Sequence, residues 1–349
     1  MTNNTDSPML ESAYKSVQDC FASVPVIVLG SGHACAFDIP GMPQLTDYIR
    51  SEVPKEVATD DIQTWKTFEA KIQYLSLEVA LQEIQLSQRL TNLIIQKTWD
   101  CIFPADRKVL ENIIQNLDYL PLSRLYRHLF DSTHHRIQLI TTNYDCLAEY
   151  AADAAGYAWA TGFGYGYIGN RYSNNHSLTI SKGSTAFRMV DVWKVHGSLN
   201  WYRAPDGYTY YLPSTTASPT NYSPVIVTPG IDKYKRTHEE PFRTIIAGAD
   251  SAMDAGRSFL CIGYGFNDEH IQPKLLEKCR RDEKSIVVLA KELTEAAKKV
   301  LLDDHCKRFV AFEQSGSSGT RMFNPKHLTG VELTGINLWS LGTLLDRIL

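Results

Sequence analysis

The stretch Val24-Pro25-Val26-Ile27-Val28-Leu29-Gly30-Ser31-Gly32 decides the fold class, because an almost continuously apolar run is followed at once by glycines. Such a run is typical of a strand that is buried on both faces of a parallel sheet. Gly30 and Gly32 could bring backbone N–H groups close to a pyrophosphate. A lone Gly-x-Gly is a weak motif, however, and a tight strand exit without a ligand is an equal alternative.

Further short β-branched runs alternate with longer segments of helical pattern along the 349 residues. Strands interleaved with helices indicate an α/β fold. We therefore predict one Rossmann-like domain over 1–349, in which a parallel sheet carries helices on both faces. The other predicted strands are 137–142, 190–196, 224–228, 258–263 and 285–290.

Two insertions are expected to interrupt this alternation. The segment from about 46 to 135 is mostly helical in spacing and too long for one crossover helix, and Pro104 and Pro121 should break it into at least three pieces. The region from about 156 to 215 reads as irregular loop followed by a hairpin around the dipeptide Asp206-Gly207. Both regions are predicted to be additions to the Rossmann-like sheet.

Composition and charge exclude several classes of function. Hydrophobic residues make up 44% of the chain and charged residues 21%, which is ordinary for a globular domain. A net charge of −4 gives no reason to expect direct binding of nucleic acid. The beginning, Met1-Thr2-Asn3-Asn4-Thr5-Asp6, lacks the pattern of a secretory signal, and no apolar run approaches membrane-spanning length. We expect a cytoplasmic protein without membrane contact.

The cysteines indicate neither disulfides nor a metal site. Seven are scattered along the chain, and none forms a Cys-x-x-Cys pair. An odd, unpatterned set is typical of reduced thiols in the cytosol. A structural zinc ribbon would need closely paired ligands, so we predict no bound metal.

Polar residues stand at the ends of two predicted strands. Asn143 follows the run 137–142, and His196 ends the run 190–196. Together with the glycines they suggest a site that holds a dinucleotide and acts on it. Taken singly, Asn143 could only cap the following helix, and His196 could be a buried core histidine. Cys35 stands where a Gly-x-Gly-x-x-Gly fingerprint needs its third glycine, which disfavours hydride transfer.

Four motifs in order resemble those of the Sir2 (sirtuin) family. Gly30-Ser31-Gly32-His33-Ala34-Cys35-Ala36-Phe37-Asp38-Ile39-Pro40 is similar to the family's Gly-Ala-Gly-x-Ser-x-x-x-Gly-Ile-Pro loop, and Thr141-Thr142-Asn143-Tyr144-Asp145 resembles its Thr-Gln-Asn-Ile-Asp. His196-Gly197 matches the family's His-Gly. Gly263-Tyr264-Gly265-Phe266-Asn267-Asp268-Glu269-His270-Ile271 looks most like the late motif of bacterial SIR2-like proteins of anti-phage defence.

The departures from the family pattern narrow the expected reaction. Deacylases of the family carry Asp-Phe-Arg where Gly41-Met42-Pro43 stands, and a four-cysteine zinc module where this chain has a tyrosine-rich hairpin. Asp38 replaces the third glycine of the family loop, and Ala34 replaces its serine. These differences put protein deacylation in doubt and favour cleavage of the dinucleotide itself.

The resemblance therefore implies an NAD⁺ glycohydrolase that releases nicotinamide, leaves ADP-ribose and depletes NAD⁺ in abortive infection. NAD⁺ would be the substrate, with no metal. The resemblance implies that Asn143 positions the attacking water or the nicotinamide ribose, and that His196 is the general base. Asp145 would bind the nicotinamide end or orient Asn143, although a simple cap or turn role stays open.

The remaining predicted cofactor contacts come from the glycine loop and the late motif. The pyrophosphate is expected on the loop, His33 could contact ribose or phosphate, and Asp268 with Gly263 would face the adenosine side. A turn or cap role for Asp268 is the alternative. The full set of predicted contacts is Gly30, Ser31, Gly32, His33, Asp145, Gly263, Tyr264 and Asp268.

Free consumption of NAD⁺ would be lethal, so the activity should await a trigger. The resemblance implies a homo-oligomer and a protein partner, for which a HerA-type ATPase is favoured over a short Argonaute. The helical insertion and the segment 331–349 are the candidate oligomer surfaces. Two other functions stay open at this stage: an NAD-dependent protein deacylase, and a catalytically silent sensor of NAD⁺ or ADP-ribose.

Overall fold

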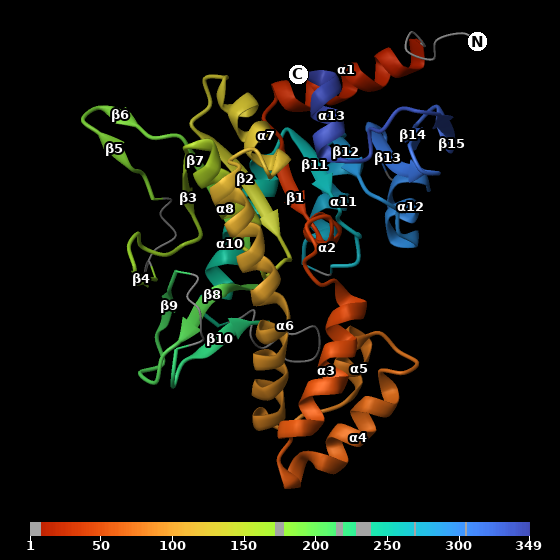
Figure 1. The fold of residues 1–349 in the computed structure, drawn as a ribbon. Helices are drawn as coiled ribbons and strands as arrows, with labels where there is room; N and C mark the ends of the chain where they lie inside the picture. Colours follow the sequence, from red (N-terminus) through yellow and green to blue (C-terminus); the bar gives the residue numbers. More distant parts are fainter. Residues whose placement is uncertain (1–7, 172–177, 214–218, 228–238, 269, 304–305) are drawn as a thin grey trace.

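A computed structural model describes most of the chain (Figure 1). The described ranges are 8–171, 178–213, 219–227, 239–268, 270–303 and 306–349. Glu269 of the late motif lies outside them. None of the helices in these ranges is both long and apolar enough to cross a membrane.

Within the described ranges the main sheet has nine strands, in the order β15-β14-β13-β12-β11-β1-β2-β7-β3. From β13 to β3 all neighbours are parallel, which confirms the predicted Rossmann-like class. β14 and β15 continue the sheet as an antiparallel edge. The strands are β13 (Phe309–Ser315), β12 (Ser285–Leu289), β11 (Ser258–Ile262), β1 (Val26–Leu29), β2 (Arg136–Thr141), β7 (Met189–Lys194), β3 (Ala158–Ala160), β14 (Gly319–Asn324) and β15 (His327–Leu333).

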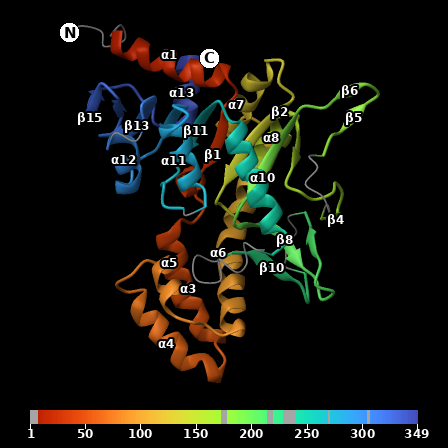
Figure 2. The same cartoon turned by 180° about the vertical axis from the view of Figure 1, so that it is seen from behind.

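Strand β1 is apolar throughout because each of its faces meets a separate core. Along β1, Ile27 and Leu29 join one core, while Val26 and Val28 join the other. Helices cover both faces, as predicted (Figures 1 and 2). The first core is covered by α1 (Pro8–Ala22), α7 (Pro121–Phe130), α8 (Leu147–Ala155) and α13 (Leu341–Ile348), and the second by α10 (Phe242–Ala255), α11 (Gln272–Arg280) and α12 (Glu295–Leu302).

A helical unit projects from the carboxyl ends of the parallel strands (Figure 1). It has its own apolar core, to which α6 contributes through Leu90 and Ile94. The side chains of Ser76 and Ser87 accept hydrogen bonds from Val79 N and Leu90 N, and so start two of its helices. The unit comprises α3 (Met42–Glu56), η2 (Thr59–Asp61), α4 (Ile62–Lys71), α5 (Leu77–Glu83) and the first half of α6 (Gln88–Gln115).

The prediction that Pro104 breaks the helical insertion was wrong, because α6 runs through it without interruption. Proline inside a helix costs about 3 kcal/mol. Burial on either side offsets that cost, since Trp99 stacks on Phe103 with ring centroids 4.2 Å apart and Val109 is buried in the same core. Pro121 does begin a helix, at the first turn of α7, where no N–H is needed.

A second, four-stranded antiparallel sheet adjoins the main one, in the order β10-β8-β9-β4. The predicted hairpin around Asp206-Gly207 is confirmed, with Gly207 at φ +86° between β8 and β9. Residues 224–226 of the predicted strand 224–228 lie in this small sheet as part of β10, antiparallel to β8, and not in the parallel sheet, while Thr228 lies outside the described residues. The region expected to be irregular also supplies β3 to the main sheet. The other short strands are β8 (Gly197–Arg203), β9 (Thr209–Tyr211), β10 (Ser223–Ile226), β4 (Gly169–Asn170), β5 (Ser181–Lys182) and β6 (Thr185–Ala186).

Candidate active site

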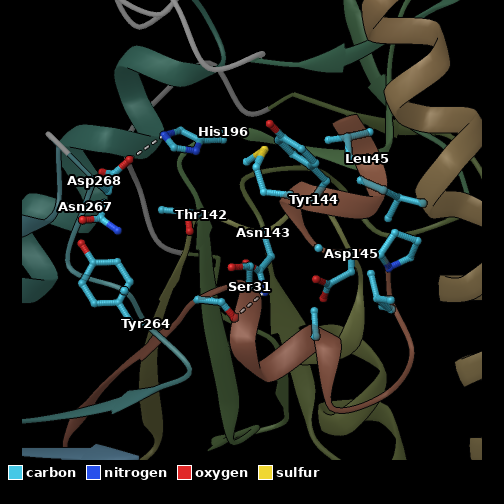
Figure 3. A pocket seen from close by; sticks show the side chains of 18 of the residues that line it. Ser31, Leu45, Thr142, Asn143, Tyr144, Asp145, His196, Tyr264, Asn267 and Asp268 are labelled. Atoms are coloured by element: carbon cyan, nitrogen blue, oxygen red, sulfur yellow. Dashed lines mark hydrogen bonds and ion pairs between the residues drawn. The ribbon is translucent and has the colours of Figure 1, made fainter. Parts of the chain in front are cut away.

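A pocket of about 310 Å³ opens where the carboxyl ends of β1, β2 and β7 face the helical unit (Figure 3). It collects polar side chains from strand exits that are far apart in the chain, together with apolar and acidic side chains from α3, α5 and α6. Its described lining comprises Gly30, Ser31, Ala34, Ile39, Pro40, Gly41, Met42, Leu45, Glu78, Ile102, Thr142, Asn143, Tyr144, Asp145, His196, Val227, Tyr264, Gly265, Asn267 and Asp268.

The glycines after β1 pack against the exit of β11. Gly30 N donates to Ile262 O at 3.1 Å, and Gly32 N donates to Gly263 O at 3.0 Å. A Cβ at Gly30 would lie 2.4 Å from Gly263 O, so only glycine allows this approach. The N–H groups of both glycines are therefore engaged within the protein, and Gly30 meets the pocket while Gly32 lies behind it.

Of Gly30, Gly32 and Gly263, Gly263 is the position that tolerates a side chain least. Its φ is +59°, and an added Cβ would lie 2.1 Å from His33 N. We expect Gly263→Ala to lower the free energy of unfolding by about 1–3 kcal/mol more than Gly156→Ala does. Gly156 also has a positive φ, +81°, but a Cβ there would meet nothing within 4 Å. Urea unfolding of both variants measures the difference, and equal losses would contradict the close contact.

Asn143 is held by two hydrogen bonds at the exit of β2. Its backbone N donates to Thr141 Oγ1 at 3.0 Å, and its Nδ2 donates to Gly30 O at 3.0 Å. The side chain is buried and lines the pocket. Oδ1 is the acceptor atom of the amide, so it can accept a hydrogen bond from a ligand or a water.

His196 lies where the chain leaves β7 and enters the small sheet. Gly197 makes this turn at φ +90°, and a Cβ there would lie 2.1 Å from Val225 O. His196 Nε2 lies 3.1 Å from Asp268 Oδ2, so the carboxylate directly faces one ring nitrogen of the imidazole (Figure 3). Asp268 Oδ1 accepts from His270 N and Ile271 N, both at 3.0 Å, which fixes the carboxylate. Asp268 thus orients the imidazole from the late motif.

Asp145 lines the pocket and also stabilises the segment around it. Its Oδ1 accepts from Leu147 N at 3.2 Å and so supports the start of α8. Burial is the main cause that raises the pKa of this carboxyl. The Asp145 carbonyl accepts a short hydrogen bond from Lys194 Nζ. Cys146 N, one residue further on, donates to Asp106 Oδ1 at 2.7 Å. The loop that carries Asn143 is thereby fixed at its far end.

Lys194 is fully buried, and its Nζ lies 3.1 Å from Glu149 Oε1, whose side chain is 2% exposed. Replacing Lys194 by methionine leaves a buried carboxylate without its cation, so we expect a loss of about 3–5 kcal/mol in the free energy of unfolding. Lys298→Met is the matched control, because Lys298 pairs with the exposed Glu295, and it should cost less than about 1 kcal/mol. A urea titration showing equal losses would contradict the importance of the buried pair.

Asp106 makes stability depend on pH. Burial raises its pKa from 3.8 to about 7, against the effect of hydrogen bonds from Cys146 and Tyr150. The folded protein therefore holds this proton more tightly than the unfolded chain does, and that contribution is lost as pH rises from about 4 to about 7. Across this range we expect the wild type to lose unfolding free energy relative to Asp106→Asn, by about 1.4 kcal/mol for every pH unit. A pH-independent difference between the two proteins in urea titrations would contradict the raised pKa.

The pocket brings together most of the predicted site residues, namely Gly30, Ser31, Asn143, Asp145, His196, Tyr264 and Asp268. Gly32, His33 and Gly263 do not line it. His33 is buried against Phe37, and burial lowers its pKa to about 4.

Sequence reasoning missed Thr142 and Asn267, which adjoin predicted residues, and also missed Glu78 and Ile102. Those two come from helices whose sequences carry no motif, so only the three-dimensional fold reveals them.

Part of the chain matches a known protein family. Residues 138–307 match the SIR2-like domain family. The match contains Asn143, His196 and Asp268 and begins after the glycine loop. This part of the chain is therefore similar to SIR2-like domains, in agreement with the resemblance of its motifs.

Distant structural likenesses also exist. One solved structure, which concerns the structural basis of sirtuin substrate affinity, is 14% identical to this chain. The two superpose with a TM-score of 0.44, over 84% of this chain and 92% of that one. A mutant Sir2 homologue in complex with ADP ribose has 13% identity and a TM-score of 0.43, covering 82% and 87%. At such identities the likeness concerns the fold alone. No curated protein matches the chain.

Proposed function

We propose that this SIR2-like protein hydrolyses the bond between nicotinamide and ribose in NAD⁺. One observation carries the proposal: Asn143 and His196, from two different strand exits, line the same pocket beside Asp145. An acceptor amide and a carboxylate-supported imidazole can position and deprotonate a water, and a nearby carboxylate suits a cationic substrate.

The charge of the pocket suits the nicotinamide end of the dinucleotide. Its described lining includes the carboxylates of Glu78, Asp145 and Asp268, and none of the lining residues in the described ranges is a lysine or an arginine. Carboxylates favour a cationic pyridinium and the positive charge that develops on the ribose. The pyrophosphate would extend past Ser31 towards the β1 exit.

The reaction can be written with these groups. The C1′–N bond breaks, and its electron pair goes to the pyridinium, so nicotinamide leaves neutral without help from an acid. Water held by Asn143 Oδ1 attacks the oxocarbenium-like C1′. Its proton passes to His196 on the ring nitrogen that does not face Asp268, and Asp268 stabilises the resulting imidazolium. The products are nicotinamide, ADP-ribose and one proton.

Turnover of NAD⁺ in H₂¹⁸O tests this function. The purified chain is assayed alone, at increasing concentration, and with an added acyl-lysine peptide. We expect nicotinamide together with ADP-ribose that carries one ¹⁸O at C1′. Nicotinamide release only with the peptide, with the acyl group transferred, would indicate a deacylase. NAD⁺ binding without turnover in any arm would indicate a sensor.

We further propose that this activity serves anti-phage defence in the cytoplasm, within a homo-oligomer controlled by a HerA-type ATPase. Support comes from the likeness of the late motif, 263–271, to defence-associated SIR2-like proteins. Co-expression with such an ATPase, followed by size-exclusion chromatography with light scattering, tests the assembly. We expect a joint complex, and two separate monomers would contradict it.

A further inference from the structure

We propose that one face of α6 positions both catalytic segments, with Asp106 and Trp99 as its positioning residues. This inference rests on the proposed function. Beyond that function, the helical unit controls the positions of the catalytic segments through these two side chains. Neither side chain belongs to a recognised motif.

Asp106 connects α6 to the segment that carries Asn143. The side chain is fully buried, its Oδ1 accepts from Cys146 N at 2.7 Å, and its Oδ2 accepts from Tyr150 OH at 2.7 Å. Both bonds reach the first turns of α8, immediately after Asn143 and Asp145. A displacement of Asp106 therefore displaces the end of the loop that carries Asn143 and Asp145.

Trp99 connects the same helix to the segment that carries His196. Its Nε1 donates to Leu199 O at 2.8 Å, and the bond is buried. Leu199 N in turn donates to Tyr144 O at 3.0 Å, so the two catalytic segments are also joined to each other. Trp99, Asp106 and this backbone bond form a closed connection between α6, the Asn143 loop and the start of β8.

The spacing along α6 places these contacts on one side of the helix. Trp99 and Asp106 are two turns apart, and Ile102 between them lines the pocket. The first half of the helix is packed into the separate core of the helical unit through Leu90 and Ile94. An α-helix is rigid along its axis. A displacement of the helical unit is therefore transmitted through α6 to both catalytic segments at the same time.

Three variants separate this role from general stability. Asp106→Ala removes the acceptor of Cys146 N. Asp106→Asn keeps an acceptor for Cys146 N and offers a donor to Tyr150 OH. Trp99→Phe keeps an aromatic ring but removes the N–H that Leu199 O accepts. Val109→Ala is the control, because Val109 is buried on α6 in the same core.

Steady-state kinetics and amide hydrogen exchange provide independent readouts. We expect Asp106→Ala to lower kcat about 100-fold and Trp99→Phe about 10-fold, with KM changed less than about threefold, because misplaced groups act mainly on the reaction step. Asp106→Asn should restore kcat to within about fivefold of the wild type. Exchange over 143–150 should accelerate about 10-fold or more in Asp106→Ala, and not in Val109→Ala.

The exchange measurement decides the inference even if the protein does not hydrolyse NAD⁺. Equal exchange over 143–150 in Asp106→Ala and Val109→Ala would overturn the positioning role. If the wild type hydrolyses NAD⁺, an equal loss of kcat in Asp106→Ala and Val109→Ala would also overturn the positioning role. The proposed function would then still stand.

Discussion

Replacing His196 by alanine is expected to lower kcat for nicotinamide release by about 10²–10⁴-fold, the usual contribution of a general base. The variant keeps the pocket but removes the group that takes the proton of the attacking water. Since His196 is expected to act on that water rather than to hold the substrate, KM for NAD⁺ should change much less than kcat. Initial rates over a range of NAD⁺ concentrations separate the two constants.

His134→Ala is the matched control, because His134 is exposed in the turn after α7. It should retain the wild-type rate within about twofold, as surface substitutions generally do. A His196→Ala protein that turns over as fast as His134→Ala would remove His196 from the mechanism.

Asn143→Ala is expected to lower kcat by about 100-fold or more, because the attacking water loses the acceptor that places it near C1′. The substitution also removes the bond from Nδ2 to Gly30 O, which joins the exits of β1 and β2. Thermal unfolding should accompany the kinetics, so that a lost water site is distinguished from a loosened pocket.

Asn92→Ala serves as the control for Asn143→Ala, since Asn92 is exposed on α6, where its Oδ1 accepts from Gln88 Nε2. We expect its activity to be that of the wild type. Nicotinamide release in Asn143→Ala at the Asn92→Ala rate, in a protein of unchanged stability, would contradict the role of Asn143.

The sheet and the principal site residues could be predicted from the sequence because both leave local patterns. The run 26–29 is apolar on both faces, and the structure buries it between two helical layers, while 137–140 is mainly apolar and contributes to the same two cores. Asn143 and His196 directly follow such runs, and parallel neighbours bring those ends together. The hairpin at Asp206-Gly207 was predictable for the same reason, since its turn chemistry is local.

Contacts between distant parts of the chain could not be predicted. The adenosine contact of Asp268 stays a prediction, and no local pattern indicated that its carboxylate lies against His196, 72 positions earlier in the chain. Asp106 sits in a helix two residues after the proline that was expected to end it, and its buried role depends on packing that no local pattern encodes. Gly30 and Gly32 were expected to direct their N–H groups at a pyrophosphate, whereas the structure directs these groups at Ile262 O and Gly263 O.

The proposed function requires above all that this pocket holds the nicotinamide ribose of NAD⁺. The most direct measurement is a crystal or cryo-EM structure of the His196→Ala protein with NAD⁺ bound, because that variant should bind the substrate without consuming it. We predict density for the ribose beside Asn143, with the nicotinamide towards Asp145 and the pyrophosphate at Ser31. NAD⁺ bound elsewhere, or bound with its adenine in this pocket, would contradict the proposed site.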